Sequence, residues 1–281
     1  MKELQAEENE ISMRAAGSLR REFHRELLSP FNRAVREYRL IKPGDRIAVC
    51  ISGGKDSMLM AKLFEEYRRN VNRSGGDFSL EFISLDPGYS EDTRRTVEEN
   101  AQKLALPLKI FPAQILSYVD NLPRNPCFMC AKMRRGNLYA HARELGCNKI
   151  ALGQHYDDVI ETVLMSMIYG GQVQTMMPRV HSANFPGLEI IRPLYFIREA
   201  DIIRWSEANG LNFIKCACRF TAGGGESSAR RRTRELISRL KEENPQVETN
   251  IFRSIHNVRL TDIISYKDED GNVHSFLDRF D

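Results

Sequence analysis

The chain has 281 residues, of which 28% are charged and 42% are hydrophobic, as expected for a globular protein with a water-exposed surface. Its net charge of +3 is too small to indicate a nucleic-acid partner by itself. Because no apolar run approaches the ~18 residues of a membrane helix, we expect a cytoplasmic protein without membrane contact. Its length suits one large α/β core, alone or with small appendages.

Residues 1–40 carry apolar side chains at helical spacing among many charges, which predicts one or two amphipathic helices. We expect this segment to form an N-terminal helical arm. Two roles stay open for it, a packing arm with a solvated charged face or a surface that contacts nucleic acid. The sequence Lys42-Pro43-Gly44-Asp45 then predicts a turn before the first strand.

A glycine loop follows the first predicted strand, Ile47–Ile51, whose β-branched residues are typical of a strand buried in a parallel sheet. From Ser57 onward apolar residues recur at helical spacing, so the loop joins a strand end to a helix N-terminus. Free amide N–H groups, the helix dipole and the ammonium of Lys55 would converge there on a phosphate-sized ligand. The residues of this cradle are Ser52, Gly53, Gly54, Lys55, Asp56 and Ser57. An ordinary glycine turn is the alternative, and the pattern is not that of a Walker A loop.

Strands and helices alternate along the middle of the chain. Further strands are predicted at residues 78–85, 107–112, 149–153 and 188–194, and helices at residues 93–104, 133–145, 157–169 and 199–208. This order predicts a Rossmann-like α/β fold, a parallel sheet with helices on both faces and ligands beyond the carboxyl ends of its strands. We expect a catalytic domain over residues 41–222. After a flexible joint at Gly223–Gly225, residues 223–281 should form a basic helical region and tail.

Because disulfides are rare in intracellular proteins, we do not expect the six cysteines to form a disulfide framework. Their spacing must therefore indicate their role. They form two pairs and two single residues, namely Cys127 with Cys130, Cys216 with Cys218, Cys50 and Cys147. The single cysteines are best explained as small apolar core residues. Because strand-end loops of a parallel sheet lie on one side, the two pairs could meet beside the glycine loop.

Two kinds of metal site are consistent with the cysteine pairs. Four thiolates could close a tetrahedral zinc site, or three thiolates could hold a cluster that leaves one iron open for chemistry. The spacing of Cys216 and Cys218 fits a single zinc tetrahedron poorly, because zinc knuckles usually place two residues between their cysteines. This spacing favours the three-cysteine cluster.

Taken together, these motifs resemble the TtcA family of tRNA 2-thiocytidine synthetases, which belongs to the PP-loop ATP pyrophosphatases. The matching stretches, which cover roughly residues 38–220 in the family's order, are Ser52–Ser57, Cys127 to Cys130 with Met133–Gly136, Ile150–Asp158, Tyr169–Gly171, Ile191–Leu194 and the region of Cys216–Cys218. The resemblance implies the PP-loop ATPase fold, also called adenine nucleotide α-hydrolase-like. It also implies ATP, Mg²⁺ and a 4Fe-4S cluster as cofactors and tRNA as the substrate.

On this resemblance the enzyme adenylylates the C2 oxygen of a cytidine, most simply the one at position 32 of the anticodon loop, and replaces that oxygen with sulfur. Cys127, Cys130 and Cys218 would bind the cluster, with Cys216 as the alternative third ligand, and the iron without a protein ligand would carry the sulfur. The sulfur donor would be a cysteine desulfurase or free sulfide. A homodimer is one assembly that the sequence leaves open.

Several further residues receive roles from their position in these motifs. Asp56 and Asp158 could bind Mg²⁺, or each could cap a helix. Arg134 and Arg192 would pair with phosphates of ATP or tRNA, or lie exposed on the surface. Asp86 and Gly153, at two strand ends, are expected to contact the nucleotide, and His155 would contact it or be structural. The arginines Arg230, Arg231, Arg232 and Arg234 oppose the dipole at a predicted helix start, which favours phosphate binding.

Two other functions stay open at this point. One is a PP-loop ATPase that acts on a uridine or on a small molecule, with the cysteines as a structural zinc site. The other is a tRNA-binding module without catalytic activity. The tail from Ile264 onward has a turn signal at Asp270-Gly271 and receives no function.

Overall fold

The computed structural model describes residues 2–119, 126–213 and 228–280. The chain forms two compact units, Met1–Val159 with Met176–Ser228, and Ile160–Thr175 with Ala229–Asp281. The expected joint at Gly223–Gly225 and the pair Cys216 and Cys218 lie outside the described residues. Among the helices that are described, none is both long and apolar enough to cross a membrane.

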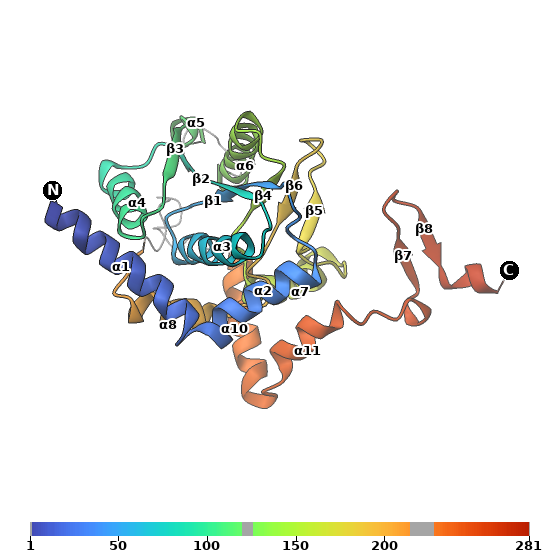
Figure 1. Ribbon diagram of the computed structural model, residues 1–281. Coiled ribbons are helices and arrows are strands. Elements are labelled where there is room, and N and C mark those ends of the chain that lie inside the picture. The colour runs from blue at the N-terminus through green and yellow to red at the C-terminus, as the bar shows by residue number, and fades with distance from the viewer. Residues whose placement is uncertain (1, 120–125, 214–227, 281) are drawn as a thin grey trace. The chain divides into compact units, whose positions relative to one another are not determined.

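The first unit is built on a six-stranded sheet with the order β3-β2-β1-β4-β6-β5 (Figure 1). Its strands are β1 (Arg46–Cys50), β2 (Ser79–Asp86), β3 (Leu108–Pro112), β4 (Lys149–Ala151), β5 (Arg179–His181) and β6 (Glu189–Ile191). All neighbours pair in parallel except β5, which runs antiparallel to β6. The predicted parallel α/β sheet is therefore confirmed, with β1 in its interior.

Helices cover both faces of this sheet (Figure 1). One face carries α1 (Lys2–Arg20), the π-helix η1 (His24–Leu28), α2 (Ser29–Glu37), α3 (Lys55–Arg73), α4 (Glu91–Lys103) and α8 (Glu199–Ala208). The other face carries α5 (Ile115–Val119) and α6 (Pro126–Glu144). Helix α7 (Tyr156–Gly170) begins in the first unit and continues into the second. The layered arrangement leaves the carboxyl ends of the strands for loops.

The N-terminal helices belong to the main core of the first unit. Leu19, Phe31, Phe64 and Trp205 are fully buried in one apolar cluster, although they come from four different helices. Their apolar faces are those that the helical spacing predicts. The described part of residues 1–40 therefore packs against the sheet layer, and the functional division at residues 40 and 222 stays a prediction.

Three differences from the sequence prediction have local causes. Strand β5 was not predicted, because its three residues are too few to establish an alternation of polar and apolar side chains. Strand β6 ends before Arg192 rather than at Leu194, since Pro193 lacks the N–H that a further ladder bond needs. Helix α6 starts at Pro126, before the predicted residue 133, and proline is well suited to a first helical position.

A buried ion-pair network ties the end of α2 to the sheet. The ammonium of Lys149 lies 2.7 Å from the carbonyl of Leu40, 2.9 Å from Asp45 and 3.2 Å from Glu189. Arg179 donates a second, forked pair of hydrogen bonds to Glu189. These bonds, first those from Arg179, outweigh the effect of burial and lower the pKa of Glu189 to about 2.

Replacing Glu189 with Gln should lower the free energy of unfolding at pH 7 by about 2 kcal/mol, because the lowered pKa stabilises the folded state. The carboxylate is charged in both states above its ordinary pKa of 4.5, so the full effect is present there. It is lost as the pH falls from that value toward the folded pKa of about 2. Chemical denaturation of both proteins across this range should show the difference shrinking.

Glu98→Gln is a suitable control, since Glu98 pairs with Arg94 at 2.9 Å but both side chains are about half exposed. An exposed pair of this kind contributes little to stability. A difference between wild type and Glu189→Gln that stays constant down to pH 3 would contradict the assignment.

The second unit contains α10 (Ser228–Glu243), α11 (Val247–Ser254) and a small hairpin with flanking 3-10 turns η2 (Leu260–Asp262) and η3 (Phe276–Arg279). The hairpin pairs β7 (Ser265–Lys267) with β8 (Val273–Ser275) in antiparallel register. Gly271 in its turn has a φ of +85°, a left-handed conformation that favours glycine. The turn predicted at Asp270-Gly271 is therefore confirmed.

Candidate active site

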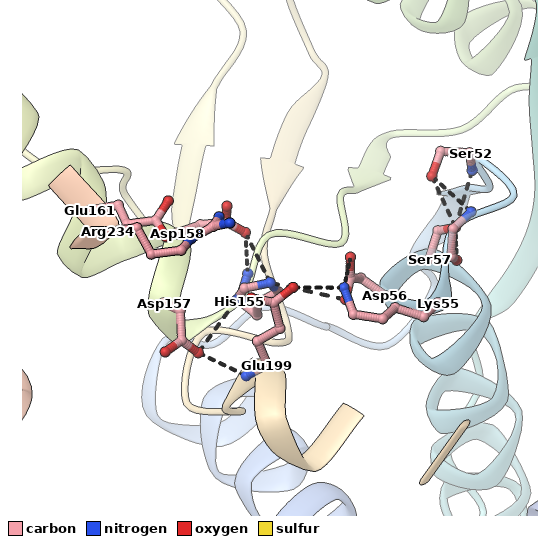
Figure 2. Close-up of polar contacts among 11 residues, drawn as sticks. Ser52, Lys55, Asp56, Ser57, His155, Asp157, Asp158, Glu161, Glu199 and Arg234 are labelled. Atoms are coloured by element: carbon pink, nitrogen blue, oxygen red, sulfur yellow. Dashed lines mark hydrogen bonds and ion pairs between the residues drawn. The ribbon is translucent and has the colours of Figure 1, made fainter. Parts of the chain in front are cut away.

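The glycine loop closes on itself through the hydroxyls at its two ends. Ser57 Oγ accepts a hydrogen bond from the backbone N–H of Ser52 at 3.1 Å and donates one to the carbonyl of Gly54 at 2.9 Å. The two hydroxyl oxygens, Ser52 Oγ and Ser57 Oγ, lie 3.2 Å apart (Figure 2). Gly53 has a φ of +84°, which only glycine adopts without strain. The backbone thus makes the tight turn that the sequence predicts.

Helix α3 begins directly after this turn, with Gly54 in an extended conformation as its N-cap. Its first amides, those of Lys55, Asp56 and Ser57, have no acceptor within the helix. Together with the positive end of the helix dipole they form a site that favours an anion. The geometry supports the expected phosphate cradle.

Gly153 brings the end of β4 against the start of α3. A Cβ atom added at Gly153 would lie 3.3 Å from the amide nitrogen of Ser57 and 3.4 Å from the carbonyl carbon of Asp56. That is tighter than most contacts of real Cβ atoms, and the neighbouring atoms belong to the backbone and cannot turn aside. A side chain at this position would cover one of the loop amides, so glycine keeps the cradle open.

Lys55 lies between two carboxylates (Figure 2). Its ammonium nitrogen is 2.8 Å from Glu199 Oε1 and 3.1 Å from Asp56 Oδ1. Burial alone would lower the pKa of Lys55, but the carboxylates of Asp56 and Glu199 outweigh it and hold the pKa above its ordinary value. Lys55 is therefore a cation at neutral pH. The pKa of Asp56 also lies above its ordinary value. Here burial raises the pKa, and the electrostatic effects of Lys55 and His155 offset this only in part.

His155 is buried at the centre of three acidic side chains. Its Nε2 lies 3.6 Å from Asp158 Oδ2 and 4.0 Å from Asp56 Oδ1, and its Nδ1 lies 3.7 Å from Asp157 Oδ2 (Figure 2). Asp158 also accepts a hydrogen bond from the backbone N–H of His155 at 3.1 Å, which caps the start of α7. Asp158 thus has the capping role, and a role in Mg²⁺ binding stays a prediction.

Asp157 orders the start of α8. It accepts a hydrogen bond of 2.7 Å from the backbone N–H of Glu199 and pairs with Arg198 at 3.0 Å. The guanidinium of Arg198 in turn lies 4.6 Å from the centre of the Tyr156 ring. These contacts fix the position of Glu199, the first residue of α8, whose carboxylate pairs with Lys55.

A second group of predicted residues gathers around the end of β2. Asp86 accepts hydrogen bonds from the backbone N–H groups of Gly88 and Tyr89 at 2.9 and 2.8 Å, which shapes the following turn. Arg134, on α6, donates to the hydroxyl of Tyr89 at 2.9 Å. Cys130, one turn earlier on α6, is buried in the apolar cluster that includes Leu85 of β2. Asp86, Arg134 and Cys130 are thus brought together.

The predicted metal ligands are placed only in part. Cys127 and Cys130 stand three residues apart in the first turns of α6, and positions so spaced share a helix face. The side chain of Cys127 lies outside the described residues, as do Cys216 and Cys218. Within the described side chains no group of three that could hold a metal ion is found. The three-cysteine site and the choice between Cys216 and Cys218 stay predictions.

Cys50 and Cys147 are buried, as predicted for core residues. Burial raises the pKa of Cys50 to about 12 and that of Cys147 to about 11. Both thiols therefore stay protonated at neutral pH, which suits a packing role and makes them poor metal ligands.

Arg192 is held by neighbours in the sheet. It donates a hydrogen bond of 3.2 Å to the side chain of Gln154 and another to the carbonyl of Met177. Burial lowers its pKa. Gln154 follows Gly153, so Arg192 lies beside the segment that borders the cradle, and the alternative of a freely exposed arginine does not apply.

The four arginines predicted to bind phosphate, all in the first half of α10, divide into two kinds within the second unit. Arg234 and Arg230 pair with Glu161 at 2.8 and 3.4 Å, and the Glu161 side chain is 3% exposed (Figure 2). These two cations neutralise a buried carboxylate. Arg231 and Arg232 are exposed. The expected phosphate contacts are therefore best supported for this second pair.

Sequence reasoning missed Glu199, Asp157 and Tyr89 as site residues. Asp157 had a signal, since it adjoins Asp158 in the matching motif, but its bond to Glu199 spans 42 residues. Glu199 had no local signal, because an acidic residue at the start of a helix is favourable in any protein.

Comparison with known proteins places this geometry in context. The PP-loop domain family matches residues 20–218. A tRNA-cytidine(32) 2-sulfurtransferase of Coxiella burnetii is 33% identical over 246 residues, covering 86% of this chain and 93% of the relative. One of Anaeromyxobacter dehalogenans is 34% identical over 237 residues, covering 83% and 79%.

Among solved structures, the U34-tRNA thiolase NcsA of Methanococcus maripaludis, determined with its 4Fe-4S cluster, has a similar fold. The TM-score is 0.66 at 23% identity, over 86% of this chain and 82% of that one. At this identity the likeness concerns the fold.

Proposed function

This chain belongs to the PP-loop family and, within it, to the tRNA-cytidine(32) 2-sulfurtransferases, and from this membership we propose that it thiolates a cytidine of tRNA in an ATP-dependent reaction. The observation that carries the proposal is the loop Ser52–Ser57, whose free helix amides and charged Lys55 form an anion site within the matched region. We propose that the ATP phosphates bind there.

The chemistry explains why such a loop suits this substrate. The C2 oxygen of cytidine is part of a urea-like group and leaves poorly. When it attacks the α-phosphorus of ATP, an oxygen–phosphorus bond forms, the bond between the α- and β-phosphates breaks, and pyrophosphate leaves. A sulfur nucleophile then adds at C2, and the oxygen departs as part of AMP. Lys55 and the amides of α3 stabilise the negative charge that develops on pyrophosphate.

Asp56 is the residue that fits a magnesium ion best. Its Oδ1 is buried and makes no hydrogen bond of good geometry, although Lys55 lies 3.1 Å away. A hard carboxylate oxygen beside a phosphate cradle is what Mg²⁺ prefers. Mg²⁺ bound there would neutralise phosphate charge, with Asp158 as a second carboxylate nearby. Lys55 would exchange Glu199 for phosphate as ATP binds.

For the cluster we propose Cys127, Cys130 and either Cys218 or Cys216 as ligands. The placement of the first two in one helix, with Cys130 buried beside the end of β2, fits a thiolate site close to the strand ends. A 4Fe-4S cluster with three protein ligands would supply an iron at which sulfur can be held. Tyr89 and Arg134 line the same region and would orient the base or its phosphate.

The remaining assignments are proposed on the same ground. Residues 41–222 would be the catalytic part, with an N-terminal helical arm before it and a basic C-terminal region after it. A cysteine desulfurase or free sulfide would supply the sulfur, in the cytoplasm. A homodimer is consistent with this scheme.

Nucleoside analysis of tRNA from cells that lack the gene tests the function directly. We expect 2-thiocytidine to disappear, and a plasmid with the wild-type gene to restore it. Loss of a thiolated uridine instead would assign the chain to the alternative substrate. Unchanged thiolated nucleosides would overturn tRNA thiolation altogether.

A further inference from the structure

The second unit presents an aromatic platform, which we define as Tyr169 with Arg232. The guanidinium carbon of Arg232 lies 5.8 Å from the centre of the Tyr169 ring. Tyr169 is 51% exposed, and the neighbouring Met167 and Ile168 are 49% and 51% exposed. Large apolar and aromatic side chains that gather at the surface in this way mark an interaction site.

Buried contacts of α10 within the second unit hold the aromatic platform in place. The pairs of Arg230 and Arg234 with the buried Glu161 join α10 to α7 within this unit. Thr233 and Ile237 of α10 are 1% and 5% exposed, so the same face of α10 is packed. With that face fixed, Arg232 has its backbone anchored on both sides by packed residues. The guanidinium and the ring are thus presented as planar surfaces from rigid elements.

We propose that the aromatic platform stacks an unpaired base of the tRNA anticodon loop. Single-stranded bases are recognised by stacking on aromatic rings and on arginine guanidinium planes. Arg231, the next residue, pairs with Glu235 at 3.8 Å, and both side chains are more than half exposed. So weak a pair leaves Arg231 able to bind the phosphate that follows a stacked base. This inference rests on the proposed function, because it takes tRNA as the substrate.

Positive charge beside the ring favours RNA over a protein partner. An apolar protein surface would gain from Met167 and Ile168 but would offer no counterion to Arg232 and none to Arg231 beyond the exposed Glu235. An RNA loop matches both the exposed ring and the positive charge, since each nucleotide has a flat base and a negatively charged phosphate.

The experiment uses the full-length protein and an anticodon stem-loop RNA with 2-aminopurine in the loop, whose fluorescence falls when the base is stacked. We expect binding to quench the probe. Tyr169→Ala should abolish the quench and weaken binding about 5-fold or more, as for loss of one base–aromatic stack. Tyr169→Phe should behave as wild type, whereas Tyr169→Leu, which keeps apolar surface but no ring, should behave as Tyr169→Ala.

The salt dependence of affinity separates stacking from charge. Tyr169→Ala should leave the slope of log affinity against log salt unchanged, because no phosphate contact is lost. Arg231→Ala should lower that slope by about 0.7 to 0.9, the value for one phosphate. As a control we choose Tyr266→Ala, since Tyr266 is 39% exposed and stacks on His274 at 4.9 Å in the hairpin. It should change neither quench nor affinity.

Two results would overturn the platform. One is an unquenched probe at every loop position with wild-type protein. The other is a Tyr169→Leu variant that binds the RNA as tightly as wild type, which would show that the ring does not stack a base. Both can be distinguished from failure of the proposed function, which is read separately as the absence of 2-thiocytidine.

Discussion

Replacing Lys55 with Ala should reduce the release of AMP from ATP in the presence of tRNA by roughly 10² to 10³-fold, the cost of removing one preorganised charge stabiliser. The reason is the position of the ammonium. It stands at the start of α3 beside the free amides, and the carboxylates of Asp56 and Glu199 keep it charged. Without it those two carboxylates would repel the phosphates.

The measurement is AMP formation with purified, cluster-loaded protein, ATP, Mg²⁺, tRNA and sulfide, because AMP leaves only when sulfur adds at C2. Lys109→Ala is the matched control, because Lys109 also pairs with a carboxylate, Glu81, at 2.8 Å but is half exposed at the surface. It should retain full activity. AMP release that persists in Lys55→Ala at the wild-type rate would remove Lys55 from the mechanism.

Replacing Cys130 with Ser should abolish thiolation but leave the reaction with ATP intact. The variant should lose iron, acid-labile sulfide and thiolation, while it keeps the tRNA-dependent release of pyrophosphate in a single turnover, because that release precedes the addition of sulfur. A hydroxyl is a poor substitute for a thiolate ligand of an iron–sulfur cluster. The glycine loop Ser52–Ser57, where we propose that the ATP phosphates bind, includes no cysteine and should be unaffected.

Metal content after anaerobic purification provides the readout. We expect wild type to be brown, with iron and sulfide in near-equal amounts. Cys147→Ser is the control, because Cys147 is as deeply buried as Cys130 yet packs in a different group of apolar core residues, away from the proposed metal site. It should keep its iron even if its stability falls. A colourless wild-type protein with one zinc ion per chain would contradict the cluster and favour a structural zinc site.

Sequence alone predicted the parts of the site that consecutive residues form. The strand β1, the glycine turn and the start of α3 follow one another within Arg46–Ser57, so local spacing and turn chemistry were sufficient. The parallel sheet followed from the alternation of elements. Site roles for Asp86, Arg134 and Gly153 depended on the resemblance, and the structure now shows contacts around each of them.

The rest depends on contacts between distant residues, which have no local signal. Lys55 and Glu199 are 144 positions apart, and Arg234 and Glu161 are 73 apart. A sequence shows that each of these side chains is charged, but it does not show which oppositely charged residue lies beside it in the fold. This is why four arginines of α10 looked equivalent, although two of them neutralise a buried carboxylate.

The packing of α1 against the core also determines when the protein can fold during synthesis. Arg14 donates to the carbonyl of Asn209 at 2.7 Å across 195 residues, and Ser18 meets the Asn209 side chain across 191. At ~5–20 residues per second, a ribosome completes these partners on the order of 10–40 s after it makes α1. The first helix can pack against α3 and α4 soon after they are made, but its bonds to Asn209 close only after α8 is complete, so joining α1 to the end of α8 is a late step of folding.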